Sequence, residues 1–543
     1  MAGSAAQGTG TDPGAGLGSE EALRLLAQLI AIAPTNLEDP LHGRWEKPHY
    51  GRASEAIVRA ARSLGLATRI YDPTLSGAPG VDWHGASRPN VIIDLDVGAK
   101  STVLILAHYD VVPVPAEQRA RWKSPPHTLT QRADGRLYAR GSNDDLGSGV
   151  VASLTALGHL VDAKDLRHNV RLLVCCDEET GGQGGIDAIR DHDDALPPDD
   201  PERILRADVA LIPDGSPETT AGSSGIAFLE ASFERPIPLA QALAAGASLV
   251  DLHELARSWR SVYTSPDWPD RHAPEPVLTG RATVTQFDLG DAKIDPDRVG
   301  LLEAHAETDA ANQVARAVTL LFGGPARPLD ELRAQLVPLV RPPYRLEPVG
   351  ASALDIPPGV RAIQVIGEAT HGGYPHRGHN PVPEAIRLLT LAAERGHIDG
   401  RSIGVASFTV DLRLIPEMEL EEALDRVRER LDADPAVRAS GMKVEAPPGR
   451  RRAGYAVAVD HPAVEKLART LKATFGVSGV YGEYGGTDAS ALRGLATPAG
   501  DPLPALVFGS MDPASHIHDA EESLDPRLFR GVVETIERYL REP

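Results

Sequence analysis

Hydrophobic and polar positions follow two alternating patterns over the first 215 residues. Short apolar runs rich in β-branched residues predict strands, and apolar residues spaced three or four apart predict helices between them. The predicted strands cover residues 67–71, 91–95, 102–107, 170–175 and 209–212. The predicted helices cover residues 20–32, 53–64, 147–160 and 185–190. Continuous apolar strands separated by helices are typical of a mainly parallel sheet covered on both faces.

The pattern changes to an α+β texture after residue 220 and returns to the first texture near residue 455. Strands are predicted at 226–233, 282–287, 360–367 and 403–414, with helices at 309–321, 383–394 and 419–432. The last part predicts helix 461–475, strand 505–508 and helix 526–540. We therefore expect a lead-in without structure at 1–19 and a split α/β domain at 20–220 and 453–543. The domain inserted between them covers 221–452, and its Pro- and Trp-containing stretch 258–276 looks like a further insertion.

The composition of the chain excludes several classes of function. The 543 residues carry a net charge of −21, which argues against nucleic acid or an anionic membrane as a partner. The two cysteines, Cys175 and Cys176, are adjacent, so neither a disulfide framework nor a thiolate zinc site is expected. The sequence shows neither a signal peptide nor a membrane span, and a cytoplasmic location is expected.

Five predicted strand ends and loops carry carboxylates or histidines. They are His108 with Asp110, Asp144 with Asp145, the run Asp177–Glu178–Glu179, Asp214, and His516 with His518. Taken singly, each has an ordinary explanation: an acidic run on a solvated loop, a helix cap, or a histidine in a turn. Taken together, they place hard oxygen and imidazole donors at the edge of a sheet where ligands bind in α/β folds. Such a set suits two divalent ions that share a carboxylate and hold one hydroxide between them.

The order of these motifs resembles one family, the co-catalytic di-zinc metallopeptidases of the aminoacylase, carboxypeptidase G and carnosinase type. The resemblance begins near residue 20 and covers nearly the whole chain. It is carried, in order, by AHYDVVPV, DGRLYARGSNDD, DEETGG, PDG, THGGYPHRGHNPV, YGGTDAS and the H-x-x-x-E spacing of His518 and Glu522. The resemblance implies a three-layer αβα catalytic domain of the phosphorylase/hydrolase-like type, with an inserted α+β, ferredoxin-like lid.

The resemblance also implies roles for residues of the first and last segments. Glu178 would be the general base that takes a proton from the bridging water, and Asp110 would orient a histidine ligand. The metal ligands would be His108 and Asp214 on one ion, Glu179 and His518 on the other, and Asp144 bridging both. His518 is chosen over His516 by its spacing to Glu522, and Asp144 over Asp145 by its spacing from Arg140 and Gly141. Zinc is the expected metal, ahead of manganese or cobalt.

In the inserted domain the resemblance implies contacts with a substrate. His371 would stabilise the oxyanion of the tetrahedral intermediate. Arg413 would pair with a substrate carboxylate, as a planar bidentate donor can; a strand-surface ion pair is its alternative. The other expected substrate contacts are Asn380, Gly485, Gly486 and Thr487.

Two features bear on the substrate and on the assembly state. In the resembled family an Asp at the position of Asp214 is typical of dipeptidases, which act on a free amino terminus, so a dipeptide or small amino-acid derivative is expected. The alternative is an N-acyl or N-carbamoyl amino acid amidohydrolase, including one that works in a specialised biosynthetic route. A non-catalytic metal-stabilised protein is a second alternative. The stretch 304–321 weakly echoes 370–391, which favours a doubled lid and a monomer over a homodimer.

Overall fold

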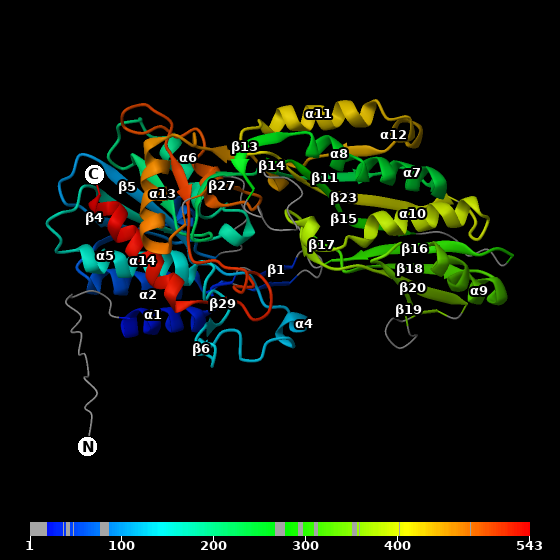
Figure 1. Cartoon of the computed structure of the whole chain (residues 1–543), viewed down its shortest axis with the longest axis horizontal. Coiled ribbons are helices and arrows are strands. Elements are labelled where there is room, and N and C mark those ends of the chain that lie inside the picture. Colours follow the sequence, from blue (N-terminus) through cyan, green and yellow to red (C-terminus); the bar gives the residue numbers. More distant parts are fainter. Residues whose placement is uncertain are drawn as a thin grey trace, which may run out of the picture. The chain divides into compact units, whose positions relative to one another are not determined.

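The computed structural model divides the chain into two compact units (Figure 1). The first comprises Met1–Ala221, Val457–Val480 and Thr487–Pro543, and the second comprises Gly222–Ala456 and Tyr481–Gly486. The structure describes residues 19–35, 37–39, 44–46, 48–76, 86–265, 277–290, 297–308, 313–349, 356–357, 359–400, 402–477 and 479–542. The predicted lead-in, apart from Ser19, and residues 266–276 of the predicted insertion lie outside this description.

The first unit is built on a sheet whose strands follow the order β10-β28-β9-β5-β8-β4-β3. The four inner strands β28, β9, β5 and β8 are parallel, whereas β4, β3 and β10 join in antiparallel pairs. The sheet is therefore parallel at its centre and mixed at its margins, as large α/β sheets often are. The bounds are β3 Ala67–Tyr71, β4 Asn90–Leu95, β5 Thr102–His108, β8 Asn169–Cys175, β9 Val209–Ile212, β10 Thr219–Ser223 and β28 Ala505–Val507.

Helices lie between these strands in the chain, which confirms the predicted α/β fold class. Helix α5 packs against α14, α14 packs against α13, and α1 packs against α2. The longer helices are α1 Ser19–Ile32, α2 Tyr50–Ser63, α5 Ala152–Leu160, α6 Ile186–Asp194, α13 Pro462–Phe475 and α14 Pro526–Arg541. Short elements complete the unit: β1 Leu37–Asp39, β2 Arg44–Glu46, α3 Pro73–Ser76, α4 Ala116–Arg119, β6 Thr130–Gln131, β7 Leu137–Tyr138 and β29 Ser523–Leu524.

The direction of the inner strands brings distant parts of the chain to one edge. Strand β5 ends at His108, β8 ends two residues before Asp177, and β9 ends two residues before Asp214. Because these strands are parallel, their carboxyl ends meet at the same edge, the usual ligand-binding edge of an open α/β sheet.

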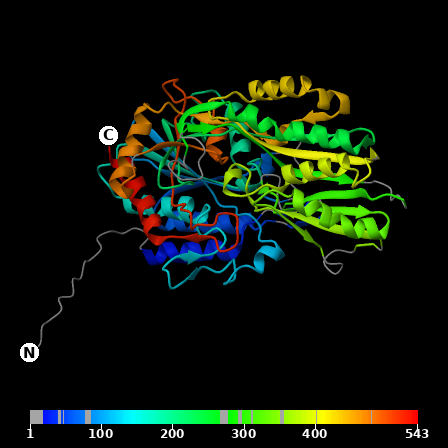
Figure 2. The same cartoon turned by 45° about the vertical axis from the view of Figure 1, so that its right-hand side comes forward.

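The second unit contains an antiparallel sheet in the order β19-β20-β18-β16-β15-β23-β11-β24. Helices α7 and α10 pack against each other and against its middle strands (Figure 2). Aromatic and aliphatic side chains such as Leu243, Phe287, Ile386 and Phe408 fill the layer between them. The strands are β11 Ile226–Ser232, β15 Arg281–Gly290, β16 Gly300–Glu307, β18 Ala317–Gly323, β19 Arg345–Pro348, β20 Val360–Ile366, β23 Val405–Arg413 and β24 Lys443–Glu445.

The helices of the second unit are α7 Leu239–Val250, α8 Leu252–Arg257, α9 Ala326–Leu336, α10 Pro381–Glu394, α11 Leu420–Asp432 and α12 Pro435–Ser440. Its remaining strands are β12 Ile237–Pro238, β13 Arg260–Thr264, β14 Val277–Thr279, β17 Gln313–Val314, β21 Thr370–His371, β22 Ser402–Ile403, β25 Arg451–Arg452 and β26 Tyr455–Ala456. Strand β27, Val480–Glu483, follows α13 in the chain.

The predicted helix at 309–321 is wrong. Residues 309–312 lie outside the description, and the rest forms β17 and β18, of which β18 pairs with β16 and β20 in the sheet. The stretch 370–391, which residues 304–321 weakly echo in sequence, instead contains most of helix α10. The echo is therefore not a structural repeat, and it no longer supports a doubled lid or a monomer.

Two further predictions can be compared with the structure. Cys175 and Cys176 are both buried and free. Among the residues that the structure describes, no helix is long and apolar enough to cross a membrane.

Candidate metal centre

His108 is fixed by the residue two positions after it. The ring nitrogen Nδ1 lies 3.0 Å from the backbone oxygen of Asp110 and 3.6 Å from its carboxylate. A proton on Nδ1 is thereby held by Asp110, which leaves the lone pair of Nε2 available to a metal. Nε2 lies 3.3 Å from Asp144 Oδ1 and 4.0 Å from Asp214 Oδ2. The strand end thus directs the ring toward two carboxylates that arrive from other parts of the chain.

Asp144 lies between the two histidines. Its Oδ1 faces His108, and its Oδ2 lies 2.8 Å from Nε2 of His518. Nε2 of His518 is also 3.1 Å from Glu179 Oε2. One carboxylate therefore presents one oxygen to each histidine, which is the arrangement that a bridging ligand between two ions requires.

The donor set fits divalent metal ions. Ligand atoms of His108, Asp144 and Glu179 all lie within 4.8 Å of one another. Among the described residues, three atoms of this cluster are buried without a hydrogen-bond partner: His108 Nε2, Glu179 Oε1 and Asp214 Oδ1. A buried polar atom without a partner is costly, so the clustering of such atoms with other donors fits a cation-binding site. Nitrogen and oxygen donors without thiolate are typical of zinc, manganese or cobalt sites.

The protonation of the cluster points the same way. Burial raises the pKa of Asp214 well above its usual value, and the nearby charges of Asp145 and Asp144 raise it further. Burial likewise raises the pKa of Glu178. For Asp144, burial raises the pKa, but the adjacent rings of His108 and His518 outweigh burial and lower the pKa. Cations bound at this cluster would compete with protons for the same carboxylates and imidazoles.

Asp110 also determines where Glu178 and Glu179 lie. Its carboxylate accepts a hydrogen bond from the backbone N–H of each, at 3.1 Å in both cases. The preceding residue, Asp177, adopts a left-handed conformation with φ of 60°. Asp177 is held there by the Tyr50 hydroxyl at 2.8 Å and by Arg88 Nε at 2.6 Å. This role of Asp177 is not predictable from the sequence, because an acidic run alone does not show which of its members face inward.

Asp145 and His516, which lie close in sequence to the predicted ligands Asp144 and His518, differ from those ligands in their contacts and exposure. Asp145 is buried and accepts a hydrogen bond from the backbone N–H of His108 at 3.2 Å, so it supports a ligand from behind. His516 is exposed, with φ of 48°.

The predicted substrate contacts lie mostly in the second unit. Arg413 is 1% exposed and forms a bidentate ion pair with Asp411, at 2.7 and 2.9 Å, so this ion pair is buried and does not lie on the strand surface. Asn380 caps helix α10 by accepting from the Val382 N–H, and its amide donates to the Val284 backbone oxygen. The side chain of His371 lies outside the described part of the structure. The contacts of these three residues with substrate stay predictions.

Hydrogen bonds to other residues of the protein hold the loop 485–487. The backbone oxygen of Gly485 accepts a hydrogen bond from the Ser223 hydroxyl at 2.5 Å, and Gly486 follows it in the chain. Thr487, in the first unit, accepts from the Ala489 N–H at 3.0 Å and so caps the turn that follows. Their contact with substrate also stays a prediction.

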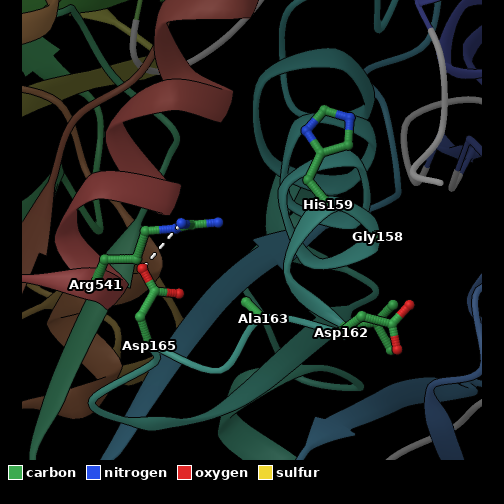
Figure 3. Close-up of a pocket in the computed structure, with 7 residues that line it drawn as sticks. Gly158, His159, Asp162, Ala163, Asp165 and Arg541 are labelled. Carbon is green, nitrogen blue, oxygen red and sulfur yellow. Dashed lines mark hydrogen bonds and ion pairs between the residues drawn. The ribbon is translucent and has the colours of Figure 1, made fainter. Parts of the chain in front are cut away.

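A separate hollow lies at the end of helix α5 (Figure 3). It has a volume of about 260 Å³ and is lined by Gly158, His159, Val161, Asp162, Ala163, Asp165 and Arg541. Arg541 forms an ion pair with Asp165 at 3.0 Å, and His159 contacts Glu537 at 2.6 Å. Arg541 and Asp165 are thus paired with each other, and His159 is paired with a residue of helix α14.

Comparison with known proteins identifies the family. The pattern of peptidase family M20/M25/M40 matches residues 104–542, so the chain belongs to this family. A cysteinylglycine-S-conjugate dipeptidase of Corynebacterium striatum is 26% identical over 492 residues, which cover 88% of this chain and 87% of that protein. The resemblance inferred from the motifs is confirmed.

Two further comparisons bear on coverage and fold. An uncharacterised metallohydrolase of Methanocaldococcus jannaschii is 27% identical over 216 residues, 39% of this chain, and the chain spans about half (49%) of that relative's length. The structure of an M20 family metallo-carboxypeptidase from Sulfolobus solfataricus covers 96% of this chain and 98% of its own, with a TM-score of 0.56 and 15% identity. This likeness confirms the predicted fold, an α/β part with an inserted α+β part.

Proposed function

We propose that this protein is a two-metal hydrolase that cleaves the amide bond of a dipeptide or a small amino-acid derivative. The observation that carries the proposal is the position of Asp144, whose two oxygens face His108 and His518 while Glu179 and Asp214 lie beside them. His108 and Asp214 would hold one ion, Glu179 and His518 the other, and Asp144 both. The name of the Corynebacterium relative supports a dipeptide as substrate.

The bound ions, of which zinc is favoured, would polarise the substrate carbonyl and lower the pKa of the water that attacks it. Glu178 would accept a proton from that water and pass it to the leaving amine. Its backbone N–H is held by Asp110, and it precedes the ligand Glu179 in the chain without being needed as a ligand. Asp110 would keep the His108 ring in the tautomer that binds metal. His371, carried by the second unit, would donate to the oxyanion.

The proposal is tested with the full-length protein reconstituted with zinc, manganese or cobalt. Matched substrates differ only at the amino terminus: a free dipeptide, its N-acetyl form and the corresponding N-carbamoyl amino acid. We expect hydrolysis of the free dipeptide. Hydrolysis restricted to the blocked substrates would instead establish the amidohydrolase alternative. No turnover with any of the three metals would contradict the proposal.

A further inference from the structure

The carboxylate of Glu522 is fully buried and accepts hydrogen bonds from one short segment of the chain. It is 0% exposed and accepts hydrogen bonds from four groups between residues 140 and 144. The donors are Arg140 Nη1 at 2.6 Å, Gly141 N at 3.1 Å, Asn143 N at 3.1 Å and Asp144 N at 3.2 Å. A buried carboxylate is stable only when its charge and lone pairs are satisfied, and Arg140, itself 1% exposed, supplies the opposite charge.

Arg140 extends the connection to His518. Its Nη2 donates to the side-chain oxygen of Gln118 at 2.9 Å, and the amide nitrogen of Gln118 donates to the backbone oxygen of His518 at 2.8 Å. One buried ion pair therefore contacts the backbone of Asp144 on one side and, through Gln118, the backbone of His518 on the other. These are the two residues whose side chains meet at 2.8 Å in the candidate metal centre.

The segment that carries His518 needs such support. His518 and Glu521 both have left-handed backbone conformations, with φ of 64° and 70°, which residues other than glycine rarely adopt. Conformations of this kind persist only where neighbouring contacts determine them. Glu521 is held by Arg132 at 3.0 Å and by the backbone N–H of Lys123 at 2.7 Å, and Glu522 is held by Arg140.

We propose that Glu522 and Arg140 are positioning residues that hold Asp144 and His518 in the arrangement that binds metal. The inference rests on the proposed two-metal function and deepens it. The N–H groups of Asn143 and Asp144 orient the peptide from which the bridging carboxylate extends, and both end on Glu522 Oε1. Partners behind a ligand commonly change metal affinity 10- to 100-fold when they are lost, because they set the ligand's orientation.

The test measures zinc affinity directly, by competition with a chromogenic chelator, on metal-free full-length protein. Glu522→Gln keeps the shape of the side chain but turns one acceptor oxygen into a donor that faces Arg140 or a backbone N–H. We expect its dissociation constant for at least one zinc ion to rise tenfold or more. Gln118→Ala breaks the link to His518 without leaving a buried charge, and we expect it to fold and to lose less affinity than Glu522→Gln.

A matched control separates positioning from general stability. Asp512→Asn breaks another ion pair between the same two stretches of chain, the bidentate pair of Asp512 with Arg136 at 2.8 and 2.9 Å. This pair donates no bond to the backbone of Asp144 or His518 in the described structure, so we expect zinc affinity within twofold of wild type. Circular dichroism and the thermal midpoint of each metal-free variant are recorded alongside.

The outcomes are distinct. If wild type binds two ions and both Glu522→Gln and Gln118→Ala bind them as tightly, this inference is wrong and the proposed function stands. If Asp512→Asn loses as much affinity as Glu522→Gln, any loosening of the two stretches is sufficient, and the assignment to Glu522 and Arg140 is overturned. If wild type binds no divalent ion, the proposed function itself fails.

Discussion

Glu178 and Glu179 are adjacent in the chain, and Asp110 holds the backbone N–H of both. The two residues nevertheless have different proposed tasks, because Glu179 lies 3.1 Å from His518 whereas Glu178 is left for proton transfer. Sequence alone could not separate these tasks: either glutamate can bind a metal, and the difference comes from which side chain faces His518 after the turn at Asp177.

A pair of neighbouring substitutions tests this division. We expect Glu178→Gln to keep its metal content and to lower kcat by a factor of about 10²–10⁴, since the variant lacks only the group that moves the proton. Glu179→Gln is the matched control and should lose one metal ion as well as activity. Metal content by mass spectrometry and steady-state kinetics measure both; unchanged turnover in Glu178→Gln would refute its role as the base.

At the scale of elements, a π-helical turn η1 (Leu146–Val151) leads from Asp145 into α5 and passes close behind His108. Gly149 lies in this turn, and a Cβ atom there would overlap the carboxylate of Asp145, which accepts from the N–H of His108. The close approach requires glycine at this one position.

We expect Gly149→Ala to lower the free energy of unfolding by about 1–3 kcal/mol, the usual cost of overpacking a buried site. Gly51→Ala, in the exposed first turns of α2, is the control, because a Cβ there meets no atom within 4 Å. It should leave stability unchanged or raise it by up to about 1 kcal/mol. Urea denaturation measures both, and equal stability of Gly149→Ala and wild type would contradict the packing argument.

Helices α13 and α14 enclose a lysine with an unusual pKa. Burial lowers the pKa of Lys466 to about 8, and its Nζ lies 2.7 Å from the Glu542 backbone oxygen and 3.0 Å from His168 Nε2. Between about pH 8 and the ordinary lysine pKa of 10.5, the unfolded chain binds this proton and the folded chain does not. The free energy of unfolding therefore rises with pH in that window.

The comparison that isolates this effect is wild type against Lys466→Met, with chemical denaturation measured at several pH values. We expect the stability of wild type relative to the variant to increase between pH 8 and 10.5. A difference that does not change between pH 8 and 10.5 would show that folding leaves the Lys466 pKa near its ordinary value.

The elements also show what a sequence pattern can and cannot predict. Strands β5, β8 and β9 were predictable because short, fully apolar runs between turn residues leave few alternatives. The stretch Ala317–Gly323 was mistaken for helix because a buried central strand is apolar on both faces and by chance matches helical spacing. Its strand character comes from pairing with β16 and β20, distant segments that local propensity does not reveal.

At the scale of the whole molecule, most of the cluster around Asp144 could be located before the structure, because parallel strands must end at one edge. The residues that hold the backbone of this cluster could not be predicted from the sequence. Glu522 and Arg140 are 382 positions apart, and Gln118 carries no sequence signal for its contact with His518. The pairing of Arg413 with Asp411, two residues earlier, could not be predicted either, because a strand position does not show which side chain lies beside it.

Metal removal should affect the two compact units differently. The candidate ligands lie in the first unit, so bound ions stabilise that unit by mass action, by about 2.7 kcal/mol at a free metal concentration 100 times the dissociation constant. Hydrogen exchange with and without a chelator should show added protection around His108, Asp144 and Glu179 with metal, and little change in α7 of the second unit. Equal changes in both units would contradict a site confined to the first.

The most direct test of the central claim is a zinc titration of the metal-free protein in which bound metal and dipeptide hydrolysis are measured in the same samples. We expect two ions to bind per chain and activity to reach its plateau only as the second site fills. We also expect Asp144→Ala, which removes the shared carboxylate, to lose both metal binding and activity. Full activity in the presence of an excess of chelator, or a plateau with one ion bound, would contradict it.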